Sequence, residues 1–71
     1  MGLNAGGTMT LKPGQAYKHF KGGVYDIVAV ENDNVKYRAR STGVVWNRSV
    51  EEFTDYVFRG FRLLKRFERL I

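Results

Sequence analysis

Cationic side chains recur at every second position in the middle of the chain, at Lys36, Arg38 and Arg40. Trp46 and Arg48 follow a few residues later. Lysine and arginine neutralise backbone phosphates, and an indole offers a flat ring on which a base stacks. These five residues are therefore the candidate contacts for a ligand, and their combination is typical of surfaces that bind single-stranded nucleic acid.

A structural interpretation of the same residues stays open. Large aromatic side chains usually fill the core of a small domain, and on those grounds we expect Trp46 to lie in the core together with Tyr25 and Tyr37. The cations are then merely solvated, and the charge alone fixes no partner.

Residues that do acid, base or metal chemistry are few. His19 is the only histidine, and no serine or carboxylate motif beside it indicates a catalytic triad, so we expect it to hydrogen-bond a turn. Glu51, Glu52 and Asp55 form one acidic cluster, which a helix start explains. The chain has no cysteine, and its carboxylates lack the spacing of a calcium loop. We expect no enzymatic activity, no metal and no cofactor.

Length and charge limit the function further. The chain has 71 residues and a formal net charge of +5, which allows one domain and favours an acidic partner such as nucleic acid or an acidic protein. The absence of cysteine fits a reducing cytoplasm. No apolar stretch reaches the length of a signal peptide or a membrane span.

The elements that must position these residues begin after a flexible leader. We expect residues 1–12 to form that leader, whose first ten residues are rich in Gly and Thr, and residues 13–71 to form a single domain. The turn signal Lys12-Pro13-Gly14 marks the boundary, because proline fixes one backbone angle and glycine relieves the next.

Four extended segments follow. Residues 15–20, 24–31, 35–40 and 44–50 read as strands, and the glycine- or asparagine-rich stretches between them read as turns. The last three strands form a meander. In the segment 35–40, Val35, Tyr37 and Ala39 share one face, and the three cations share the other, which must meet solvent or a ligand.

The C-terminal part begins with a short helical turn over residues 50–53, which Ser49 is suited to cap. The segment 56–71 is ambiguous. Its arginines recur at spacings of three and four, which favours an amphipathic helix, whereas Gly60 and the many aromatic residues favour two strands that turn at Gly60.

The order of distinctive residues from Gly14 to Leu70 resembles the family known as domain of unknown function 1653. The matching motifs are Tyr17-x-His19-Phe20-Lys21-Gly22, then Tyr25 and Ile27, Tyr37-Arg38, Gly43-x-x-Trp46-x-Arg48, Phe53, Val57, Gly60 and Arg66-Phe67-Glu68. The chain departs from the family pattern at Ser49 and Lys65, where the family tends to have proline.

The resemblance implies a bacterial or phage protein with an all-β fold, a small, partly open SH3-like barrel of about five short strands and one short helical turn. It therefore favours a hairpin in the last segment over the alternative, an α+β fold with a helix over residues 56–70. It implies no activity. We expect a structural role for the motif residues Tyr17, His19, Phe20, Gly22, Tyr25, Trp46, Phe53 and Phe67.

The leading functional prediction is a non-catalytic module that binds nucleic acid through the basic strand. The alternative is a module that binds a peptide or partner protein through an aromatic groove or an exposed strand edge. A basic helix on an anionic membrane is a third possibility. Unprotected strand edges are also compatible with self-association.

Overall fold

The run of Val, Ile and Tyr in the middle of the chain forms the longest strand of the computed structural model, which describes residues 11–70. The expected strand over residues 24–31 is confirmed. The elements in chain order are β1 (Ala16–His19), β2 (Val24–Glu31), β3 (Asn34–Ala39), β4 (Val45–Ser49), α1 (Val50–Phe53), β5 (Tyr56–Arg59), β6 (Arg62–Lys65) and β7 (Phe67–Arg69).

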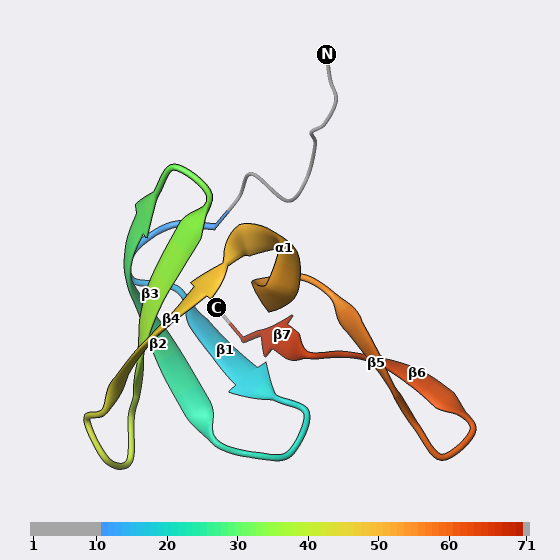
Figure 1. Ribbon diagram of the computed structural model, residues 1–71. Coiled ribbons are helices and arrows are strands. Elements are labelled where there is room, and N and C mark those ends of the chain that lie inside the picture. The colour runs from blue at the N-terminus through green and yellow to red at the C-terminus, as the bar shows by residue number, and fades with distance from the viewer. Residues whose placement is uncertain (1–10, 71) are drawn as a thin grey trace.

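These strands form one large and one small antiparallel sheet. The large sheet has the order β4-β3-β2-β1-β7, and β5 pairs with β6 in the small sheet. Figure 1 shows the large sheet curling around the short helix while the β5–β6 hairpin projects away from it. The described residues thus form the expected all-β, partly open barrel with one short helix, and the meander β2-β3-β4 is confirmed.

The predicted turns have the expected backbone. Gly14 in the first turn has φ of 93°, and Gly22, which follows β1, has φ of 102°. Asn32 between β2 and β3 has φ of 55°, a value that asparagine tolerates better than most residues.

The core lies on one face of the large sheet. Val35, Tyr37 and Ala39 are buried and the residues between them are exposed, so the predicted alternation of β3 is confirmed. Phe53 from α1 stacks on Phe67 from β7, with ring centroids 4.1 Å apart and an interplanar angle of 5°. The helix and the last strand therefore close the core over β3.

Local chemistry accounts for the short helix. The side-chain oxygen of Ser49 accepts a hydrogen bond of 3.1 Å from the backbone N–H of Glu52, as the N-cap prediction requires. Glu51 and Glu52 occupy the first turn, where negative charge is favourable. The helix start therefore accounts for the position of both carboxylates without a catalytic role.

The C-terminal segment is a hairpin followed by a strand. Tyr56 pairs with Lys65 and Arg59 with Arg62, with Gly60 at the tip in a left-handed conformation (φ 66°). The helix over residues 56–70 is wrong, because the positive φ of Gly60 and the extended pairing on either side of it are incompatible with a continuous helix. The hairpin that the resemblance favours is confirmed.

The packed part of the chain begins earlier than the expected boundary at residue 13. Leu11 is 8 % exposed and belongs to the core cluster, and the backbone N–H of Lys12 donates to the side chain of Gln15. Residues 1–10 of the expected leader lie outside the described residues. Among residues 11–70, no helix is long and apolar enough to cross a membrane.

Candidate functional site

The strand register divides the five candidate contact residues between the two faces of the large sheet. Arg48 is paired with Val35 and Trp46 with Tyr37, whereas Arg38 is paired with Val45. Directly paired residues of neighbouring strands share a face. Trp46 and Arg48 therefore lie on the face that carries the core, here called the inner face, and Lys36 and Arg38 lie on the opposite, outer face.

The outer face holds cations whose charge is partly neutralised. Arg40 follows β3 and forms an ion pair with Asp26, with Nη2 2.6 Å from Oδ1 and a second hydrogen bond from Nε. The hydrogen bond from Arg40 lowers the pKa of Asp26, and the nearby charge of Arg38 acts in the same direction. Lys36 and Arg38 are exposed as expected, but Arg40 is not an unpaired cation.

Trp46 is not in the core. The expectation that it fills the core is wrong, since 52 % of the residue is exposed. Its strand β4 is at the edge of the sheet, and Phe53 and Phe67 already cover the inner face at Tyr37. The indole is thus left beside the core. Tyr37 is buried as expected, and Tyr25 is half-buried and packs against the core.

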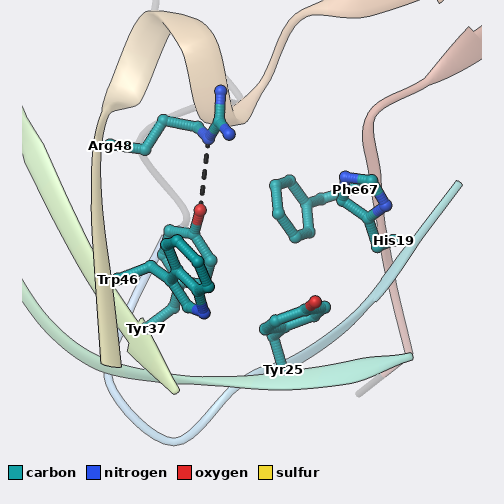
Figure 2. Close-up of a pocket in the computed structure, with 6 residues that line it drawn as sticks. All are labelled: His19, Tyr25, Tyr37, Trp46, Arg48 and Phe67. Atoms are coloured by element: carbon teal, nitrogen blue, oxygen red, sulfur yellow. Dashed lines mark hydrogen bonds between the residues drawn. The ribbon is translucent and has the colours of Figure 1, made fainter. Parts of the chain in front are cut away.

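The exposed indole lines a pocket of about 180 Å³ on the inner face. Figure 2 shows its side chains converging from every strand of the large sheet. The lining residues are His19 from β1, Tyr25 from β2, Tyr37 from β3, Trp46 and Arg48 from β4, and Phe67 from β7. None of them is acidic.

Phe67 holds the aromatic wall of the pocket together. Its ring centroid lies 4.9 Å from that of His19, 5.6 Å from that of Tyr25 and 5.3 Å from that of Tyr37, all in edge-to-face arrangements. Such pairs stabilise each other beyond the area that they bury. The wall is therefore preformed by packing, and a planar ligand entering it meets rings in fixed positions.

Arg48 supplies a positive charge at the pocket. Its Nε donates a hydrogen bond of 3.2 Å to the hydroxyl oxygen of Tyr37, which is drawn as the dashed line in Figure 2. Among residues 11–70, the terminal amino groups Nη1 and Nη2 have no hydrogen-bond or ion-pair partner. The guanidinium is thus oriented by one bond while two donor groups are available for an anion.

His19 stands at the far side of the pocket from Arg48. Its Nδ1 accepts a hydrogen bond of 3.1 Å from the backbone N–H of Lys21, so the expectation that it bonds a turn is confirmed. Burial lowers the pKa of His19, and the positive charges of Arg66, Arg48 and Lys21 lower it further. The neutral ring is therefore favoured, and this region has a positive potential.

The other motif residues have mainly structural positions. Tyr17 and Phe53 are buried in the core, with ring centroids 5.1 Å apart. Phe20 follows β1, and its ring lies 4.6 Å from that of His19. Gly22 is in the turn between β1 and β2.

Four pocket residues were expected to be structural and not ligand contacts: His19, Tyr25, Tyr37 and Phe67. They come from four different strands, so no local motif joins them in sequence. A signal for part of the site was present, because Trp46, Arg48 and the apolar Val50 alternate at period two and so share one face. The register between β3 and β4 then places that face on the inner side of the sheet.

Carboxylates do not gather into a metal site. Within residues 11–70, no group of three or more His, Cys, Asp or Glu side chains could hold a metal ion. Asp55 instead binds Arg66 through two hydrogen bonds, of 2.6 Å and 3.2 Å. The acidic cluster of the sequence is thus divided: Glu51 and Glu52 lie in the first turn of α1, and Asp55 forms an ion pair with Arg66.

Fold and pocket together define a small all-β module with a cationic, aromatic-walled pocket. The profile of a family described as "Protein of unknown function (DUF1653)" matches residues 15–69, and the chain belongs to this family. This confirms the family resemblance of the motif residues. No curated protein and no solved structure matches the chain.

Proposed function

We propose that this protein is a non-catalytic, SH3-like binding module for single-stranded nucleic acid, in which a base stacks on Trp46 and an adjoining phosphate binds Arg48. The observation that carries the proposal is the exposed indole of Trp46 beside the guanidinium of Arg48 in one pocket. Stacking on an aromatic side chain contributes about 1 to 3 kcal/mol per base. Arginine on the same face adds charge-assisted hydrogen bonds to phosphate.

The charge of the pocket supports an anionic ligand. The guanidinium of Arg48 lines the pocket, and positive charges of Arg66 and Lys21 act on His19 at its other side. Aromatic pockets also bind methylated ammonium groups, through the attraction of a cation to ring faces. A resident arginine and the absence of acidic lining residues oppose a cation here, so a flat ring attached to a phosphate fits better.

The outer face is the less suitable surface for the same ligand. Lys36 is paired across the sheet with Ala29 and Asn47, and Arg38 with Asp26 and Val45. These neighbours offer no ring for a base to stack on, and Asp26 repels phosphate. Lys36 and Arg38 are therefore proposed to add long-range attraction and not specific contacts.

A fluorescence-polarisation titration with labelled single-stranded DNA and RNA at two salt concentrations tests the proposal. The logarithm of the association constant should fall by about 0.7 per phosphate contact for each tenfold rise in salt. Trp46→Ala should remove the stacking contribution, and Arg48→Gln one phosphate contact. The matched control is Lys36→Gln, which removes one exposed charge from the outer face.

No binding of either nucleic acid at low salt would contradict the proposal. So would equal losses in Arg48→Gln and Lys36→Gln, because only net charge would then matter. Circular dichroism of each variant checks that the sheet is intact. Trp46 is half-exposed on an edge strand, so Trp46→Ala disturbs little packing, whereas Arg48→Gln also removes the hydrogen bond to the hydroxyl of Tyr37.

The second candidate is a module that binds a peptide, which the open edge of β4 favours. β4 is the terminal strand of the large sheet, and both Val45 at its start and Val44 just before it are exposed. An extended peptide, or the edge strand of a second copy, can pair with such an edge. Partners retained from a lysate after nuclease treatment, and lost when a proline replaces Asn47 in β4, would favour this candidate over nucleic acid.

The origin and location of the protein are part of the proposal. A bacterial or phage source is what the family resemblance implies, and the absence of cysteine from the chain supports a place in a reducing cytoplasm.

A further inference from the structure

The β5–β6 hairpin, which projects from the body of the molecule (Figure 1), carries positive charge and exposed apolar side chains. Arg59, Arg62 and Lys65 are its charged residues, and residues 56–65 include no acidic one. Phe61 next to the tip is fully exposed, at 104 % of its reference area. An isolated two-stranded hairpin is marginally stable in water, so exposed rings on it indicate a partner.

Two like charges face each other across this hairpin. Arg59 is directly paired with Arg62, on the ribbon face that also carries Val57 and Leu64. Like charges at directly opposite positions destabilise an antiparallel pair, and among residues 11–70 neither arginine has an acidic partner. An anion placed between them would turn this repulsion into attraction. The arrangement therefore points to an anionic ligand.

The hairpin is connected to the pocket by aromatic contacts. The guanidinium carbon of Arg59 lies 5.8 Å from the ring centroid of Phe20, and Phe20 packs against His19 at the pocket wall. A second hollow of about 240 Å³ joins the same region to the base of the hairpin. It is lined by Lys18, His19, Phe20, Leu64, Lys65 and Glu68.

We propose that Arg59 and Arg62 form a second phosphate-binding point for the strand of nucleic acid whose base enters the pocket at Trp46. This inference rests on the proposed function and extends it to a ligand of several nucleotides. In this arrangement the nucleic-acid strand passes from Arg48 over His19 and Phe20 to the arginine pair. The exposed ring of Phe61 offers a further stacking surface. A single nucleotide would reach only the pocket.

The charge of the hairpin favours nucleic acid over a second copy of the chain. Each copy has a formal net charge of +5, and the hairpin contributes only cations, so association through it would bring like charges together. A polyanion removes that repulsion. The contact between Arg59 and Phe20 also directs this charge toward the pocket and not away from it.

The test uses fluorescence polarisation with two labelled ligands, a thymidine dinucleotide and an oligothymidylate of about 12 nucleotides, within the span of roughly 4 to 16 that one small barrel covers. The double variant Arg59→Gln/Arg62→Gln should bind the longer ligand about tenfold more weakly and lower its salt slope by about 0.7, the value of one phosphate contact. Its affinity for the dinucleotide should equal that of the wild type. Lys36→Gln/Arg38→Gln is the control, since it removes the same two charges from the outer face.

The outcomes separate the inference from the proposed function. If the wild type binds neither ligand, the proposed function fails, and this inference fails with it. If the wild type binds the longer ligand and both double variants bind it equally, only the role of the arginine pair is overturned. Loss of binding to phosphatidylserine vesicles in Arg59→Gln/Arg62→Gln, with unchanged binding of the oligonucleotide, would also overturn it and assign the hairpin to a membrane surface. Thermal unfolding confirms that both double variants are folded.

Discussion

Arg66 binds Asp55 across the base of the β5–β6 hairpin. Nε of Arg66 donates to Oδ1 of Asp55 at 2.6 Å and Nη2 donates to Oδ2 at 3.2 Å, while the backbone N–H of Arg66 donates to the carbonyl oxygen of Asp55. The carbonyl oxygen of Arg66 in turn accepts a hydrogen bond from Phe20. The pair therefore joins both ends of the hairpin to the end of β1 and fixes the direction in which the arm projects.

Asp55→Asn should destabilise the protein by about 1 kcal/mol, because it removes the charge from a bidentate, partly buried pair. Urea unfolding followed by circular dichroism measures this. Asp26→Asn is the control, since its pair with Arg40 is more exposed, and its effect should be smaller. Equal effects of the two substitutions would show that the Asp55 pair does not anchor the hairpin.

Phe53→Ala should unfold the domain at ordinary temperature. Phe53 is 1 % exposed and its ring contacts those of Tyr17, Tyr37 and Phe67. Truncating a buried phenylalanine costs about 3 to 5 kcal/mol, which is comparable with the roughly 3 to 5 kcal/mol that the core of so small a domain supplies. Thermal unfolding is the measurement. Phe58→Ala is the matched control. Phe58 is 78 % exposed, so this substitution should leave the thermal midpoint almost unchanged.

The stability of the fold should decrease as the pH falls below about 6.5, and His19 is the reason. Burial and the cations nearby lower the pKa of His19 in the folded state, so the unfolded chain binds the proton more readily. The contribution of His19 to stability is therefore fully present above its pKa in the unfolded chain, and it is lost as the pH falls toward its pKa in the folded protein. In a pH series of thermal midpoints, His19→Gln should lack this decrease. The same decrease in the variant would assign it to other groups.

Gly60→Asn should be tolerated at the hairpin tip, whereas Gly60→Val should destabilise the hairpin. Gly60 has φ of 66°, a conformation that asparagine adopts more readily than a β-branched residue. A Cβ atom there would meet nothing within 4 Å, so backbone strain and not a clash decides the outcome. Thermal unfolding of both variants tests this, and equal midpoints would contradict it.

Trp46 should report directly on the pocket through its fluorescence. It is the only tryptophan of the chain and is half-exposed beside Arg48. We expect the emission of a solvated indole, with a ratio of iodide to caesium quenching above that of free tryptophan, because the surroundings are positive. Arg48→Gln should reduce the difference between the two quenchers. Emission at short wavelength that neither ion quenches would mean that the indole is buried in solution.

Much of the local structure follows from the sequence. Val35, Tyr37 and Ala39 alternate with charged residues, and the hydrophobic effect alone requires that they share the buried face. Ser49 before two glutamates determines the start of a helical turn by hydrogen bonding within a few residues. Such effects need no knowledge of distant parts of the chain. Periodicity alone, however, favours a helix in the last segment, whereas Gly60, the aromatic residues and the family resemblance favour the hairpin.

The site itself was decided by tertiary structure. The sequence determined that Lys36 and Arg38 are exposed, and that Trp46 and Arg48 share a face. It did not determine which face, because that depends on the register between β3 and β4, and a shift of one residue would exchange the two faces. The pocket takes a side chain from every strand of the large sheet, including one from β7 near the end of the chain. Only the folding of separate strands into one curved sheet brings those rings and the guanidinium of Arg48 together.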